Sequence, residues 1–178
     1  MRVIAGEFRS RRLKTLPGLA LRPTPDHLRQ ALFDVLAPRI DGVIFLDAYA
    51  GSGSVGIEAL SRGASRAVFV EKHFAAANMI RQNLASLQIE DRATVVQRGS
   101  LAALGEWDAD IYFLDPPYTQ PDEYRSALTL LGERTLRPQA SVLAQHARKF
   151  ELADAYGQLR RTRVLAHGDN AVSFFVVS

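Results

Sequence analysis

Short apolar runs alternate with helical patterns along most of this chain, and this alternation restricts the possible folds more than any other feature. We expect strands at 43–46, 67–70, 94–96, 111–114 and 141–144, and helices near 25–36, 54–62, 74–87 and 122–134. Apolar strands separated by helices are typical of a parallel sheet that is covered on both faces. We expect the 178 residues to form a single α/β domain over 1–178.

The two ends of the chain depart from this pattern. Residues 2–4 and 12–16 alternate in polarity around the glycine- and serine-containing stretch 6–10, which predicts a small basic β-hairpin as an N-terminal extension over 1–20. Near the C-terminus, the strand patterns at 163–166 and 172–177 are separated by a short turn. Two strands joined in this way predict an antiparallel hairpin.

The composition excludes several kinds of site. The chain has no cysteine, which excludes disulfides, thiolate metal ligands and thiol nucleophiles. Residues 1–12 lack the apolar region of a signal peptide, and no apolar stretch is long enough to span a membrane. We therefore expect a cytoplasmic protein with no metal site and no membrane contact.

A glycine-rich loop follows the first strand of the expected sheet. Gly51, Gly53 and Gly56 have G-x-G-x-x-G spacing between a strand and a helix, which is the setting in which this pattern binds a nucleotide cofactor. Glu71 closes the second strand, where a carboxylate can accept hydrogen bonds from both ribose hydroxyls. The cofactor-binding residues predicted here are Asp47, Tyr49, Ala50, Gly51, Ser52, Gly53, Gly56, Glu71, Lys72, Ser100 and Asp115.

These features alone fit either a nicotinamide dinucleotide or S-adenosylmethionine. Asp47, four residues before the first glycine, favours S-adenosylmethionine, because an acid at this place can bind the amino end of a methionine moiety but sits poorly beside a pyrophosphate. Asn83, on the next helix, is interpreted as a structural residue.

The tetrad Asp115, Pro116, Pro117 and Tyr118 follows a buried strand and is the predicted catalytic element. The prolines make the turn stiff and leave carbonyl groups without backbone partners. The Asp115 carboxylate and the Pro116 carbonyl are then placed to orient the two N–H bonds of a planar amine, so that its lone pair can attack a sulfonium methyl. Tyr118 would stack on the nucleobase. The tetrad suits methylation of an exocyclic base amine and fits adenine as well as guanine.

Positive charge is concentrated at the N-terminus. Residues 1–30 hold seven Arg or Lys and two acids, whereas the whole chain has a formal net charge of +3. Clustered cations of this kind can follow a phosphate backbone. The predicted RNA-binding residues are Arg2, Arg9, Arg11, Arg12, Lys14, Arg22 and Arg29.

The motifs Asp47–Gly56, Glu71 and Asp115–Tyr118, in this order, resemble those of class I S-adenosylmethionine-dependent amino-methyltransferases. Together with Arg2–Gly6 and Glu58–Gly63, the chain resembles, nearly end to end, the bacterial 16S ribosomal RNA guanine-N2 methyltransferases. The resemblance implies a Rossmann-like, seven-stranded mixed sheet whose last strand is antiparallel. It also implies S-adenosylmethionine as methyl donor, and transfer to the N2 amine of a guanine in 16S rRNA. The substrate implied is the assembled small ribosomal subunit or its precursor, and we expect the enzyme to act as a monomer.

Two positions differ from this family. An acid near the adenine is usual after the third strand, where this chain has Ser100, so Ser100 or a backbone group must serve instead. An acid is also usual late in the fifth strand, where this chain has Gln145 and His146. His146 is interpreted as a packed or exposed histidine rather than a catalytic base.

Three other functions stay open at this point. An N6-adenine methyltransferase acting on DNA or RNA could use the same tetrad, although the DNA enzymes usually carry an added recognition region. A protein-glutamine methyltransferase would use the same planar-amide chemistry but would leave the basic N-terminus unexplained. A non-catalytic nucleotide- or RNA-binding module is disfavoured because Asp47, Glu71 and Asp115 occur together.

Overall fold

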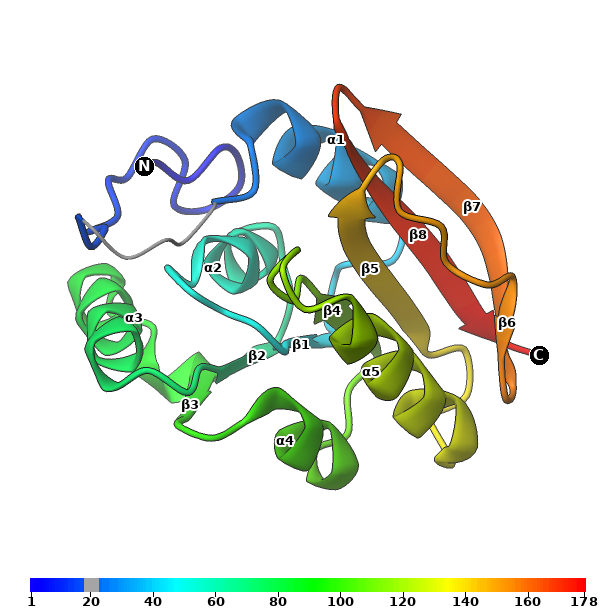
Figure 1. Cartoon of the computed structure of the whole chain (residues 1–178). Helices are drawn as coiled ribbons and strands as arrows, with labels where there is room; N and C mark the ends of the chain where they lie inside the picture. Colours follow the sequence, from blue (N-terminus) through cyan, green and yellow to red (C-terminus); the bar gives the residue numbers. More distant parts are fainter. Residues whose placement is uncertain (18–22) are drawn as a thin grey trace.

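The computed structural model describes residues 1–17 and 23–178, and its centre is one sheet flanked by helices (Figure 1). The strands are β1 (Ile44–Asp47), β2 (Arg66–Val70), β3 (Ala93–Val96), β4 (Ile111–Leu114), β5 (Ser141–Ala147), β6 (Ala155–Tyr156), β7 (Leu159–His167) and β8 (Asn170–Val177). The helices are α1 (Asp26–Leu36), α2 (Ser54–Ser61), α3 (Phe74–Leu87), α4 (Ser100–Glu106) and α5 (Pro121–Glu133), with a short 3-10 helix at Glu90–Arg92.

The strands lie in the order β3-β2-β1-β4-β5-β8-β7-β6. The first five in this order run parallel, β8 is antiparallel to β5, and β7 is antiparallel to β8. The α/β class, the parallel sheet and the C-terminal antiparallel hairpin are therefore confirmed. The described residues form eight strands rather than seven, because the two residues of β6 fold back on the start of β7 through a turn at Gly157.

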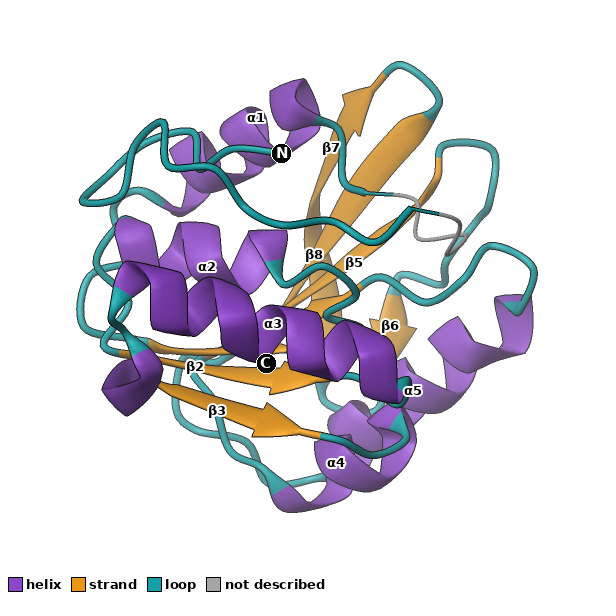
Figure 2. Ribbon diagram, turned by 90° about the vertical axis from the view of Figure 1, so that its left-hand side faces the viewer, coloured by secondary structure: helices purple, strands orange, loops and turns teal. Residues whose placement is uncertain are grey.

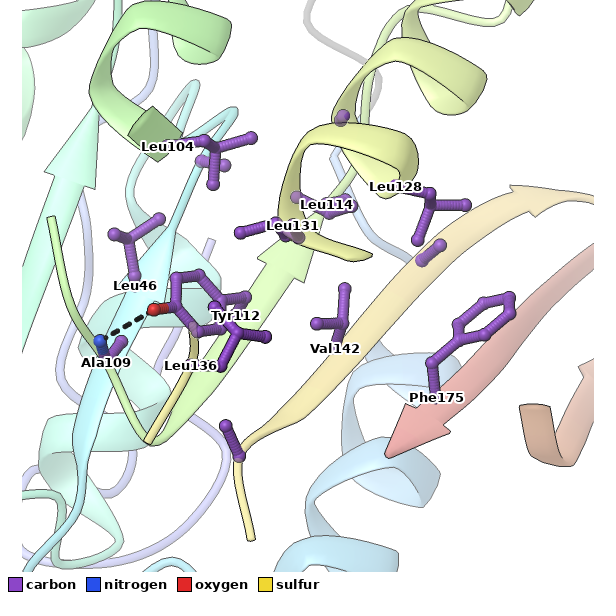
Figure 3. Packing of buried hydrophobic residues seen from close by; sticks show 14 of the residues in the cluster. Leu46, Leu104, Ala109, Tyr112, Leu114, Leu128, Leu131, Leu136, Val142 and Phe175 are labelled. Carbon is purple, nitrogen blue, oxygen red and sulfur yellow. Dashed lines mark hydrogen bonds between the residues drawn. The ribbon is translucent and has the colours of Figure 1, made fainter. Parts of the chain in front are cut away.

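Helices cover both faces of the sheet, as the apolar strands require (Figures 1 and 2). The helices α1, α2 and α3 pack on one face, and α4 and α5 pack on the other. Tyr112 of β4 lies in the core between the sheet and the helices α4 and α5, where it packs with Leu46 and Leu131 among others (Figure 3). The backbone N–H of Ala109 donates to the Tyr112 hydroxyl at 3.0 Å, so the one polar atom of this ring is satisfied in the core.

The predicted N-terminal hairpin forms only as a short antiparallel pairing, in which the N–H groups of Val3 and Leu13 donate to the carbonyls of Arg11 and Met1. The described part of this segment has a single isolated bridge between Arg2 and Arg12 rather than two paired strands. The backbone N–H groups of Ile4 and Ala5 donate instead to the carboxylate of Glu58 on α2, at 2.9 and 3.0 Å. These donors are used in docking the segment onto a helix and are not available for a ladder.

Apolar side chains complete the docking of this segment, because Val3, Phe8 and Leu13 are buried against α2 and α3. Figure 2 shows the segment lying along the outer side of these two helices. No helix in the described ranges is long and apolar enough to cross a membrane.

Candidate active site

A cleft of about 700 Å³ opens at the carboxyl ends of the parallel strands. The loops that follow β1, β2, β3 and β4 line it, together with the end of β5 and the residues just before α1. This edge of an open parallel sheet is where α/β proteins bind their ligands. The predicted cofactor loop and the predicted catalytic tetrad therefore share one cleft.

The glycine loop has the backbone shape that its spacing predicts. Gly51 and Gly53 have φ of 53° and 78°, a left-handed conformation that is costly for other residues. A Cβ at Gly56 would lie 2.3 Å from a ring carbon of Phe69 on β2. The first two glycines let the chain turn beside the ligand, and the third lets α2 pack against the sheet.

Asp47 is a buried acid at the end of β1, only 1% exposed. Its Oδ2 accepts the N–H of Gly56 at 3.2 Å, while Oδ1 is buried without a hydrogen-bond partner in the described residues. Burial raises the pKa of this carboxyl from 3.8 to about 7, and the nearby Glu71 adds to the rise. A buried carboxylate oxygen that lacks a donor fits the amino group of a methionine moiety.

Glu71 directly follows β2 and contacts the glycine loop from the other side. Its Oε2 accepts the N–H of Gly51 at 2.9 Å, and its Oε1 accepts the N–H of His73 at 2.8 Å. Oε1 also lies 2.8 Å from Nδ1 of His73, so Oε2 is the oxygen that keeps room for a second donor such as a ribose hydroxyl. Lys72 lies next to it on the lining of the cleft, with its side chain exposed.

Tyr49 connects the cofactor loop to the opposite helix layer. Its hydroxyl donates to Oε1 of Glu123 on α5 at 3.0 Å. Burial raises the pKa of this phenol, and the negative charge of Glu123 raises it further. Ser100, at the start of α4, hydrogen-bonds with the same tyrosine and lines the cleft. The structure thus places Ser100 on the cofactor side of the cleft. Glu123 belongs to no motif, so the sequence analysis did not identify it.

The tetrad is held in place by groups that the sequence analysis did not identify. The Tyr124 hydroxyl of α5 lies 3.3 Å from the carbonyl oxygen of Pro116 and 2.9 Å from that of Gln145. Its single proton is shared between the two acceptors, which ties the tetrad to the end of β5. The Tyr118 hydroxyl donates to Oδ1 of Asn170, the first residue of β8, at 2.9 Å.

Two polar residues of β5 take different roles. His146 is 3% exposed, and its ring nitrogens lie within hydrogen-bond distance of the Ala147 carbonyl and the Ser173 hydroxyl. Burial lowers the pKa of this imidazole, as expected for a packed histidine. Gln145 lines the cleft, and its Oε1 accepts a hydrogen bond from the Thr24 hydroxyl at 3.0 Å.

The predicted RNA-binding cations divide into two groups. Arg2, Arg9, Arg11, Arg12 and Lys14 are exposed on the N-terminal segment, whereas Arg22 lies outside the described residues. Arg29 is 0% exposed, so its prediction as an RNA contact is wrong. Its Nη2 donates to the carbonyl of Arg2 at 2.7 Å and to Asp26 at 3.1 Å.

Asn83 is structural, as interpreted from the sequence. Its Oδ1 accepts the N–H of Lys14 at 2.8 Å, and its Nδ2 donates to the carbonyl of Lys14 at 3.1 Å. This pair of bonds fixes the far end of the N-terminal segment to α3. The segment then reaches the cleft, whose lining includes Met1, Thr15 and Leu16.

Comparisons with known proteins identify relatives along the whole length of the chain. The family described as "Conserved hypothetical protein 95" matches residues 1–176. The Bacillus subtilis protein YlbH, named as a candidate rRNA methyltransferase, is 36% identical over 181 residues, with 98% of each chain covered. The ribosomal RNA small subunit methyltransferase D of Haemophilus influenzae is 38% identical over 151 residues, which cover 82% of this chain and 78% of the relative.

Solved structures give the same fold. A candidate methyltransferase of Escherichia coli, yhhF, superposes with a TM-score of 0.88 at 31% identity, covering 100% of this chain and 98% of the other. An RNA methyltransferase of Salinibacter ruber, solved with S-adenosyl-L-homocysteine, has a TM-score of 0.65 at 17% identity over 87% and 93% of the two chains, a likeness of fold alone. The chain thus shares its architecture with these methyltransferase structures. The chain belongs to the family described as conserved hypothetical protein 95.

Proposed function

We propose that this protein transfers a methyl group from S-adenosylmethionine to the exocyclic N2 amine of a guanine in 16S ribosomal RNA. Its membership among S-adenosylmethionine-dependent rRNA methyltransferases rests on relatives that match most of the chain. The choice of guanine N2 rests on the sequence resemblance alone, because the tetrad fits adenine as well as guanine. The observation that carries the proposal is that the tetrad and the glycine loop line one cleft.

The cofactor half of the cleft has hydrogen-bond acceptors for both the amino group and the ribose of S-adenosylmethionine. Oδ1 of Asp47 lacks a partner in the described residues and would accept a hydrogen bond from the amino group. Glu71 would accept from the ribose hydroxyls, and the Gly51 turn lets the backbone approach closely. S-adenosylmethionine supplies an electrophilic methyl group when it is bound there.

The acceptor half orients the amine. Asp115 and the carbonyl of Pro116 accept hydrogen bonds from its two N–H bonds, which turns the lone pair of the nitrogen towards the cofactor half of the cleft. The amine gains positive charge as it reacts, so the Asp115 carboxylate stabilises it and takes up the released proton. The ring of Tyr118, held by Asn170, stacks on the base. Orientation supplies most of the acceleration in such a site.

The exposed cations of the N-terminal segment contact the RNA backbone. Arg9 and Arg12 are exposed and make no ion pair within the part of the chain that the structure describes, so both charges are available to phosphates. We further propose that the substrate is an assembled small ribosomal subunit or its precursor. The enzyme would act on it in the cytoplasm, as a monomer.

Substitution of the catalytic acid tests the proposal. With small ribosomal subunits and S-adenosylmethionine, Asp115→Ala should abolish methyl transfer, while S-adenosylhomocysteine binding measured by calorimetry stays near the wild-type value. Mass spectrometry of the product nucleosides should find N2-methylguanosine. Methyladenosine as the product, or full activity of Asp115→Ala, would refute the assignment.

The RNA contact has its own test. Charge reversal of Arg11 and Arg12 to glutamate should weaken binding to the subunit and reduce the dependence of affinity on salt. Charge reversal of Arg66, an exposed arginine on β2, is the matched control. Equal losses of affinity for the subunit in both variants would show that the N-terminal charges form an ordinary solvated surface.

A further inference from the structure

Gln145 lies beside the catalytic acid at the end of two neighbouring strands. The registered pairs of β4 and β5 end with Leu114 and Ala144, so Asp115 and Gln145 are the next residues of two parallel strands. Such strands lie about 4.8 Å apart. The Tyr124 hydroxyl, close to the carbonyls of both Pro116 and Gln145, keeps the two chains together beyond the ladder. Both Asp115 and Gln145 line the cleft.

The carboxamide of Gln145 is held at one end. The Thr24 hydroxyl, itself 4% exposed, donates to Oε1 at 3.0 Å. Thr24 is the one hydrogen-bond partner of this side chain within residues 1–17 and 23–178. A carbonyl oxygen accepts two hydrogen bonds, and an amide nitrogen donates two. Gln145 itself is 1% exposed, so its remaining acceptor and its N–H donors lie at the buried wall of the cleft, with Oε1 held on the Thr24 side.

A buried amide in this position would be costly if it stayed without partners, and the acceptor base can provide them. When the N2 amine of a guanine is at Asp115, the next groups along the same edge are the N1–H donor and the O6 acceptor. A carboxamide is complementary to this pair, because its oxygen accepts from N1–H and its nitrogen donates to O6. When the N6 amine of an adenine is at Asp115, the next groups are a lone pair at N1 and an apolar C2–H, so the amide oxygen finds no donor on the base.

We propose that Gln145 reads the N1–H and O6 edge of the acceptor guanine, and that Thr24 is the positioning residue that fixes its orientation. This inference rests on the proposed function and goes beyond it, because the tetrad by itself fits adenine as well as guanine. It assigns the choice of base to a residue of β5 outside the tetrad.

The test measures base preference rather than activity alone. The methylated position is first mapped with the wild-type enzyme, and small subunits are then prepared with guanine or adenine at that position. The full-length enzyme is assayed on both with radiolabelled S-adenosylmethionine, and kcat/KM on guanine is divided by kcat/KM on adenine. This ratio is unaffected by a partial loss of folded protein, and S-adenosylhomocysteine binding checks the cofactor half.

Gln145→Met keeps the side-chain length but removes the donor and the acceptor, so the guanine-to-adenine ratio should fall on the order of 100-fold. Thr24→Val should lower the ratio as well, whereas Thr24→Ser, which keeps the hydroxyl, should largely preserve it. An unchanged ratio in Gln145→Met would overturn the inference while leaving guanine methylation by the wild type intact. If the wild type methylates no guanine in the subunit, the proposed function fails, and the inference fails with it.

Discussion

The buried carboxylate of Glu58 is the anchor of the N-terminal segment, and its removal is the perturbation that tests this architecture most directly. The side chain is fully buried on α2, where it accepts the N–H groups of Ile4 and Ala5 and pairs with Nε of Arg62 at 2.8 Å. Arg29 lies 4.0 Å away, also fully buried. Glu58→Gln keeps the shape of the side chain but removes the charge and replaces one of its two acceptor oxygens with an N–H donor.

The expected cost follows from what the change leaves behind. Desolvation already lowers the pKa of Arg29, and its Nε and Nη1 have no hydrogen-bond partner within the described ranges. The glutamine would leave this buried cation with the exposed Asp26 as its one carboxylate partner in the described residues. Removing one partner of a buried ion pair costs about 3–5 kcal/mol. For a chain of this size each kcal/mol corresponds to about 2–4 °C, so the melting temperature should fall by roughly 6–20 °C.

Denaturant and thermal unfolding measure this loss. Glu133→Gln, at an exposed acid of α5, is the control and should change the free energy of unfolding by less than about 0.5 kcal/mol. The double variant Glu58→Gln with Arg29→Met should be more stable than Glu58→Gln alone, because it removes the buried cation that the glutamine leaves poorly paired. If Glu58→Gln unfolds with the wild-type free energy, the charge of Glu58 does not hold the segment and the reasoning is wrong.

Three further predictions concern the cleft. Burial raises the pKa of Asp47 from 3.8 to about 7, so between these pH values the folded protein keeps a proton that the unfolded chain loses. The free energy of unfolding without ligand should therefore fall from about pH 4 to pH 7. Asp47→Asn should remove that pH dependence in melting experiments. Gly56→Ala would place a Cβ 2.3 Å from an aromatic ring and should lower the free energy of unfolding by about 1–3 kcal/mol, whereas Gly99→Ala, with open space around it, should not. Tyr118→Phe removes a hydrogen bond made at 2.9 Å and should lower kcat/KM on subunits by about 3–10-fold; an unchanged value would show that the ring needs no such support.

Much of the fold could be predicted because its signals are local. The strands β1 to β5 are short apolar runs between helical patterns, and the glycine loop has a fixed spacing between a strand and a helix. The strand β7 was predicted too short, since Arg160 and Arg161 interrupt its apolar pattern where it lies near the edge of the sheet. The N-terminal hairpin was predicted from alternation alone, which does not reveal that a distant carboxylate binds its backbone.

The candidate site likewise combines residues in local motifs with residues that join them only in the folded chain. Asp47, Glu71 and the tetrad lie in motifs and could be located in the sequence. The residues that hold them are spread along the chain. Glu123, Tyr124 and Asn170 contact the motifs, and Gln145 contacts Tyr124, only after the sheet has formed. Arg29 was grouped with the exposed cations because sequence gives its charge but not its burial.

The N-terminal segment combines two functions through one anchor. Its apolar residues and backbone dock on α2 and α3, which leaves Arg9 and Arg12 exposed towards solvent and brings Met1 to the cofactor loop, where the Ser52 hydroxyl lies 3.8 Å from its sulfur. Undocking the segment would therefore displace the charges proposed to bind RNA and remove part of the cleft wall together. Neutralising the exposed arginines would affect RNA binding alone. Glu58→Gln should accordingly weaken both S-adenosylmethionine and RNA binding, and a variant that loses only one of them would show that the segment does not act as a unit.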